Sequence, residues 1–259
     1  MFSNTYPLFK PGRILKIEML EALRDFPKEF IDINLEKYSN GILSGCDIEI
    51  NDDYMIVTKG VIKYQNTIYV LKENYTIPYE SNNNTQILKI RFLGETINKD
   101  FIKYDTEIFL DDNLDVNRDE MELCRFKLKR GARLRANYVD FRDMSTEYDT
   151  VNIINCPFSS HEVSSLSPKI LKNFGKEVFK YNPTNPLDIS FAMICLQSKD
   201  VIESDLLKGY IESRLKISFR EFSNDYIYNQ LLNILEELME GNNDCEKQNR
   251  SRYKRILVD

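Results

Sequence analysis

The sequence predicts an α+β fold, in which an N-terminal helix and an antiparallel β-meander or sheet region precede a C-terminal helical bundle. Apolar and polar residues alternate repeatedly through residue 155, a pattern typical of half-buried strands. The connections between these segments are too short to cross over to a parallel partner. Beyond residue 158 the apolar spacing becomes helical. Strands followed by helices indicate the α+β class.

The first helix is expected over residues 13–25, because Ile14, Ile17 and Leu20 recur at helical spacing and Pro27 should end it. Four short strands are then expected within residues 40–71 as one meander. In the first of them, Cys46, Ile48 and Ile50 share a face. Further strands are predicted at residues 75–79, 86–93, 101–110, 121–128 and 151–154.

Four helices should follow, each recognised by its first residues. Ser167-Pro168 and Asn185-Pro186 are N-cap and first-turn proline pairs, Asp200 with Glu203 resembles a capping box, and Ser223 opens a helix that Gly241 should end. We therefore expect a β-rich domain over residues 1–158, a helical domain over 159–245 and a basic tail over 246–259.

Charge and composition exclude several classes of function. The net charge is -6 with 29% charged residues, which argues against a nucleic-acid-binding protein. A weaker hypothesis of nucleic-acid binding depends on Arg130, Arg133, Arg135 and the basic tail. No run of eighteen apolar residues predicts a membrane span, and residues 1–13 do not resemble a secretory signal. Five cysteines without a CxxC pair indicate synthesis in a reducing compartment, which we take to be the cytoplasm.

The acidic loop that runs from Asp111 to Glu122 has the spacing of oxygen ligands found in an EF-hand. Val116 stands where the sharp turn of that motif needs glycine, and strands rather than helices flank the loop. We therefore favour an acidic hairpin loop without calcium, and no cofactor or metal is predicted for the chain.

Two other groups of residues could carry catalysis, and for both we favour a structural role. Cys156 and His161 could form a nucleophile–base pair, but no third group is evident to hold the base. Asp140, Asp143 and Glu147 could serve as acid and base, although such clusters more often lie in solvated turns. No catalytic residue is predicted.

The C-terminal residues combine basic and apolar side chains. We expect them to pack on their own domain or on a neighbouring subunit, and the predicted interface residues are Arg252, Lys254, Arg255, Ile256 and Leu257.

Four segments carry a resemblance to a known family: FKPGRILKIEMLEAL, YSNGILSGCDIEI, IVTKGVIKYQNTIYVL and CRFKLKRGARLR, followed by the helical end. In this order they resemble uncharacterised proteins from the tail and baseplate gene clusters of Gram-positive prophages and phage-tail-like bacteriocins. The resemblance covers nearly the whole chain and brings no catalytic motif with it.

The resemblance implies a structural subunit of a contractile-tail baseplate, an adaptor between the baseplate and the receptor-binding fibre. Its partners would be other tail proteins, and it would end in the assembled particle after synthesis in the cytoplasm. The alternative is a hydrolase that acts on cell-wall glycan at the tail tip, with Asp140, Asp143 and Glu147 as the only plausible acidic group.

Overall fold

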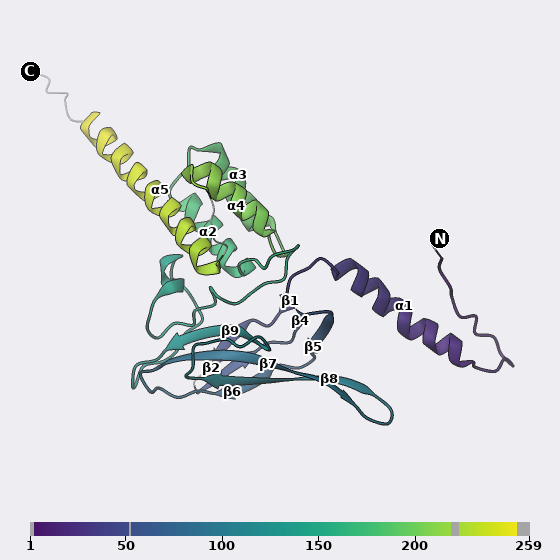
Figure 1. Ribbon diagram of the computed structural model, residues 1–259. Helices are drawn as coiled ribbons and strands as arrows, with labels where there is room; N and C mark the ends of the chain where they lie inside the picture. Colours follow the sequence, from purple (N-terminus) through teal and green to yellow (C-terminus); the bar gives the residue numbers. More distant parts are fainter. Residues whose placement is uncertain (1–2, 52, 219–222, 253–259) are drawn as a thin grey trace, which may run out of the picture. The chain divides into compact units, whose positions relative to one another are not determined.

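The computed structural model describes the backbone of residues 3–51, 53–218 and 223–252, and side chains up to residue 241. The chain divides into two compact units, Met1–Tyr38 and Ser39–Asp259. The second unit holds the strands β1–β9 and the helices α2–α5 (Figure 1), so the α+β class is confirmed. The expected division near residue 158 stays a prediction.

The first unit contains one helix, α1 (Ile17–Leu35), which continues through Pro27. The expected end at Pro27 is therefore wrong. Proline removes one backbone hydrogen bond and strains the preceding turn, but helix-forming residues on both sides maintain the remaining bonds. No residue of α1 is buried.

Nine strands form three antiparallel sheets among the described residues of the second unit. Their bounds are β1 (Gly41–Gly45), β2 (Ile48–Asn51), β3 (Tyr54–Val57), β4 (Gly60–Tyr64), β5 (Thr67–Leu71), β6 (Tyr75–Pro78), β7 (Thr85–Ile97), β8 (Ile102–Asp111) and β9 (Glu120–Lys127). The strand orders are β1-β4-β5, β2-β3-β6 and β8-β7-β9.

The predicted four-stranded meander over residues 40–71 is instead five strands. Strands β1–β4 form one long hairpin that changes sheets halfway, and β5 pairs with β4. The base of the hairpin pairs Gly45 with Gly60, and its outer part pairs Ile48 with Val57. Between them the chain bends at Cys46, whose φ of 58 is left-handed. A Cβ on Gly60 would lie 2.5 Å from the Cys46 backbone nitrogen, so only glycine fits this crossing. The bend places β2 and β3 in a second sheet, in which β3 pairs with β6.

Residues 151–154 do not form the predicted last strand. Asn152 makes an isolated antiparallel bridge with Arg125 of β9, without a ladder. Val151 and Ile154 are buried in the core, so this segment uses its apolar side chains for packing rather than for strand pairing.

Helices α2 (Pro168–Lys180), α3 (Pro186–Gln197), α4 (Ser204–Leu215) and α5 (Asn224–Arg252) follow the strands. The predicted caps of α2 and α3 are confirmed, because Ser167 accepts from the Lys169 amide and Asn185 from the Leu187 amide. The Ser223 hydroxyl likewise accepts from the Tyr226 amide at the start of α5.

Two expectations about the helices are wrong. The predicted capping box is absent, because α4 begins after Glu203 and no side chain caps it. Helix α5 also does not end at Gly241, where a glycine costs about 0.5–1 kcal/mol relative to alanine but no proline follows to stop the helix.

One continuous core joins the sheets and helices of the second unit. Phe141 stacks on Tyr228 of α5 with ring centroids 4.7 Å apart, and it meets Phe174 of α2 edge to face. Asp188 of α3 is fully buried and accepts hydrogen bonds from Tyr210 and Arg214 of α4. These contacts fix the helices against one another and against the loop that follows β9.

Candidate functional site

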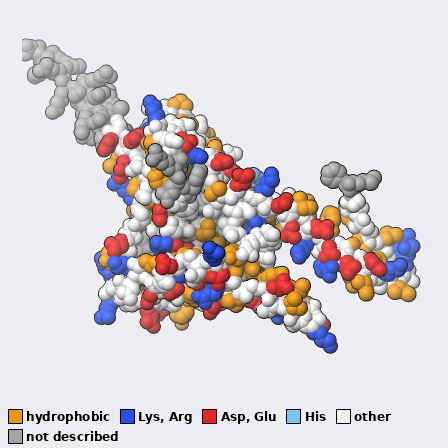
Figure 2. Space-filling model, in the orientation of Figure 1, with side chains coloured by type: hydrophobic (Ala, Val, Ile, Leu, Met, Phe, Trp, Pro, Cys, Tyr) orange, Lys and Arg blue, Asp and Glu red, His pale blue; other side chains and the backbone are white. Residues whose placement is uncertain are grey.

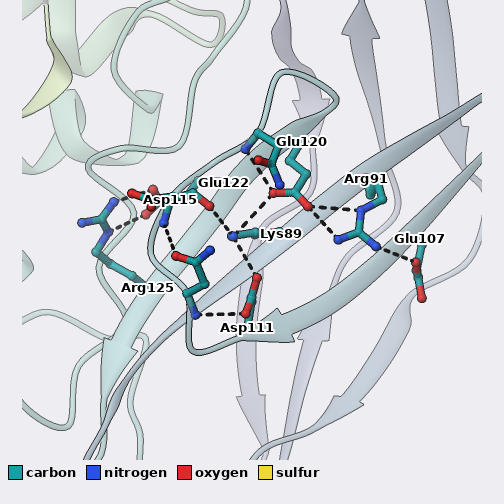
Figure 3. Close-up of polar contacts among 10 residues, drawn as sticks. Lys89, Arg91, Glu107, Asp111, Asp115, Glu120, Glu122 and Arg125 are labelled. Carbon is teal, nitrogen blue, oxygen red and sulfur yellow. Dashed lines mark hydrogen bonds and ion pairs between the residues drawn. The ribbon is translucent and has the colours of Figure 1, made fainter.

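The acidic loop between β8 and β9 has a buried lysine at its centre, supplied by β7. Lys89 is fully buried and lies between apolar Leu88 and Ile90 in sequence. Its ammonium donates to Asp111 Oδ2 at 2.9 Å and to the Asp115 carbonyl at 2.5 Å. It also lies 3.5 Å from Glu120 Oε2 (Figure 3).

Arginine and backbone groups complete this cluster. Arg91 donates from Nε and from its terminal nitrogen to Glu120 Oε1, at 3.1 and 2.7 Å. Burial by itself would raise the pKa of Glu120, but the hydrogen bonds from Arg91 and Asn117 outweigh it and lower the pKa. The hydrogen bond from the Asn113 amide lowers the pKa of Asp111 most, and the hydrogen bond from Lys89 lowers it further.

Two of the carboxylates expected to bind calcium are therefore paired with protein cations. The Lys89 ammonium binds the Asp111 carboxylate and the backbone carbonyl of Asp115, while Glu122 is held by Arg125 through two bonds of 2.7 and 2.6 Å. Among the described residues, no group of three or more His, Cys, Asp or Glu side chains could hold a metal ion. The Lys89 ammonium thus offsets part of the negative charge of the loop and ties the loop to β7.

The three carboxylates considered for glycan hydrolysis are each engaged in a separate contact. Asp143 forms two bonds of 2.5 Å with Arg135, which lower the pKa of Asp143 to about 2. Asp140 accepts from the Asp143 amide at 2.9 Å, and Glu147 pairs with Lys127 at 2.8 Å. Asp143 is therefore ionised at neutral pH and cannot act as a general acid, which requires a raised pKa.

Cys156 and His161 lack the properties of an activated pair. Cys156 is buried, and burial raises the pKa of its thiol well above the ordinary value. A reactive cysteine needs the opposite, a lowered pKa and access to solvent. His161 is exposed, with Nδ1 3.9 Å from Glu162 Oε1.

Basic residues were considered for nucleic-acid binding and for an interface, and the structure describes only some of them. Arg135 is engaged by Asp143, while Arg130 is exposed in a turn. Of the predicted interface residues, Arg252 belongs to α5, and its side chain lies outside the described part of the chain. The other four, Lys254, Arg255, Ile256 and Leu257, lie entirely outside the described residues. That interface stays a prediction.

Two exposed apolar surfaces were not predicted as interaction sites. The first is the unit of residues 3–38, on which hydrophobic side chains are visible at the surface (Figure 2). Tyr6, Phe9, Leu20 and Phe30 are among its exposed large side chains. The second is the far end of the β7–β8 hairpin, which exposes Leu93, Ile97, Phe101, Ile102 and Tyr104. Helical periodicity in the sequence indicated the apolar stripe of α1, but it does not show which side chains are exposed within this unit.

No helix in the described part of the chain is long and apolar enough to cross a membrane. No protein-family model matches the chain, and no curated protein matches it.

Solved structures with a similar arrangement come from type VI secretion baseplates. They include a chain of the TssK-TssF-TssG baseplate subcomplex (8% identity, 92% of this chain and 100% of that chain, TM-score 0.42). A crystal structure of TssK matches at 6% identity (91% and 72%, TM-score 0.44), and a chain of the type VI baseplate complex at 8% (91% and 69%, TM-score 0.41).

Proposed function

We propose that this chain is a structural subunit of the baseplate of a phage tail or phage-tail-like particle, acting as an adaptor between the baseplate and the receptor-binding fibre. It is made in the cytoplasm and then becomes part of the assembled particle. The kind of particle is taken from the resemblance of the four quoted segments to baseplate-cluster proteins.

The observation that carries the proposal is the apolar surface of the unit formed by residues 3–38. This unit has one helix, no buried residue in that helix and many exposed large apolar side chains. A segment of fewer than about 40 residues rarely stabilises itself without disulfides, metals or association. Monomeric proteins rarely leave large apolar patches exposed, whereas subunits of assemblies bury them on their neighbours.

The residues weighed for catalysis favour this reading over the alternative of a glycan hydrolase. Asp143 is bound to Arg135, and Glu147 is bound to Lys127. Both carboxylates are thus engaged in ion pairs of the fold, whereas the apolar surfaces are available to a partner.

The proposal is tested by tagging the chain in cells that produce the particle and isolating particles by gradient centrifugation. We expect the tagged chain to sediment with the particle, and cryo-EM to place it between the baseplate and the fibre. A variant that lacks residues 3–38 should keep its far-UV circular dichroism signal for the second unit but should not be incorporated.

A chain that stayed outside the particle would contradict the proposal. So would particles that assemble normally but lose wall lysis when Asp140, Asp143 and Glu147 are replaced together by alanine. That second result would favour the hydrolase.

A further inference from the structure

The second unit has a cavity of about 310 Å³ between two sheet edges. Its volume is at the lower end of the range of roughly 300–1,000 Å³ found for ligand pockets. Apolar residues from several strands line it, among them Val57, Ile62, Ile90 and Leu123. Asp105 of β8 adds an acidic side chain to this lining.

Strand β5 presents its edge to the cavity rather than one of its faces. Four consecutive residues, Ile68 to Leu71, line it, although successive side chains of a strand point to opposite faces. Only the edge of a strand can border one space with every residue. Tyr104 to Thr106 of β8 do the same on the other side.

Both edges lack a neighbouring strand within the described part of the chain. In the sheet order β1-β4-β5, strand β5 pairs only with β4, and in the order β8-β7-β9, strand β8 pairs only with β7. A free edge offers N–H and C=O groups in a row, which an extended segment can join as an additional strand. The cavity beside it, lined by apolar side chains and by strand edges, would receive the side chains of that segment.

The N-terminal arm, defined as residues 3–16, has the chemistry of such a segment. Residues 3–10 form neither helix nor strand, and Tyr6, Leu8 and Phe9 are exposed. The arm contains Lys10, Arg13 and Lys16 and no acidic residue, which complements the acidic side chain of the cavity.

The two prolines of the arm define which of its sides can pair. In an extended chain, alternate residues direct their backbone groups to the same side, so Pro7 and Pro11 both lie on the odd side. The even residues Tyr6, Leu8 and Lys10 keep their N–H groups on the other side. Proline in sheets is confined to edge strands for this reason. The arm can therefore pair with a strand along one of its sides only, and it would be the last strand of the sheet that it joins.

We propose that the arm of a second copy of this chain adds to the free edge of β5 through its even-numbered residues and places apolar side chains in the cavity. This inference deepens the proposed function by naming one partner, and it can fail independently, because it concerns the purified chain rather than the particle.

The test compares two proline variants of the full-length chain by sedimentation velocity and hydrogen exchange. Leu8→Pro removes a backbone N–H on the pairing side. Phe9→Pro is the matched control, because it removes a backbone N–H on the opposite side and also replaces a large apolar side chain. Both positions are exposed, so neither change should affect the core.

We expect the wild type and Phe9→Pro to sediment as a dimer or larger, and the amides of β5 to exchange slowly. Leu8→Pro should sediment as a monomer with exchange in β5 faster by about tenfold or more.

Three results would overturn the inference. A monomeric wild type with slow exchange in β5 would mean that the chain's own arm occupies the edge. Fast exchange in β5 of an oligomeric wild type would place the contact between copies elsewhere. Equal effects of the two prolines would exclude strand pairing of the arm.

Discussion

Replacing Lys89 with methionine tests the central electrostatic feature of the fold. Methionine keeps most of the length of the side chain but removes the charge. The change leaves Asp111 Oδ2, the Asp115 carbonyl and Glu120 Oε2 without the ammonium that lies 2.9, 2.5 and 3.5 Å from them. The Glu120 side chain is 1% exposed, so water cannot replace the lost partner.

Removing one partner of a buried ion pair costs about 3–5 kcal/mol, because the other charge stays buried without compensation. Arg91 still binds Glu120, so we expect a loss near the lower end of this range. For a domain of this size, each kcal/mol lowers the melting temperature by roughly 2–4 °C, which gives a decrease of at least about 6 °C.

The assay is equilibrium unfolding in urea, with Lys103→Met as the matched control. Lys103 is exposed on β8, so the same chemical change should alter the free energy of unfolding by less than about 0.5 kcal/mol. The loss in Lys89→Met should also shrink as the pH falls toward about 4, since the uncompensated carboxylates then become protonated. A loss below about 1 kcal/mol for Lys89→Met would refute the reasoning.

Five further outcomes are expected. Because Asp143 has a pKa lowered to about 2 in the folded chain, its contribution is complete above its ordinary pKa near 3.8 and is lost as the pH falls toward 2; Asp143→Asn should abolish this part of the pH dependence of unfolding. Gly60→Ala should destabilise by about 1–3 kcal/mol, because its Cβ would meet backbone atoms at 2.5 and 2.6 Å. Gly209→Ala, where nothing lies within 4 Å in α4, should instead stabilise by about 0.5–1 kcal/mol in the same urea assay. The thiol of Cys156 should resist alkylation in the native chain and react after unfolding, as followed by mass spectrometry. Titration of the wild type with millimolar calcium in a calorimeter should give no heat of binding at the loop that begins at Asp111, and a saturable heat would contradict its occupation by lysine.

Local signals in the sequence predicted most elements of the fold. Strand alternation located β4 to β9 within a few residues, because half-buried strands repeat every two residues. The caps at Ser167 and Asn185 marked the starts of α2 and α3, since their side chains bond the first free amides of a helix.

The stop signals were less informative than the start signals. Pro27 and Gly241 both lie inside helices, although each was expected to end one. A single unfavourable residue costs at most a few kcal/mol, which the bonds of the surrounding turns can exceed. The ends of helices therefore depend on context over a longer stretch of chain.

The acidic loop shows why its role could not be derived from spacing. Its carboxylates fit a calcium motif by position, and Val116 and the flanking strands were the only local objections. Lys89, which fills the loop, lies more than twenty residues earlier and looks in sequence like an interruption of an apolar strand. Only the pairing of β7 with β8 and β9 brings it there.

The sequence alone determined the α+β class, the order of strands and helices and most of their starts, because these follow from local periodicity and capping. Tertiary structure decided the switch of the first hairpin between two sheets, the cation inside the acidic loop and the edges of β5 and β8 that have no neighbouring strand. These features depend on which distant segments meet, and the energies of such contacts are not encoded in any single stretch of residues.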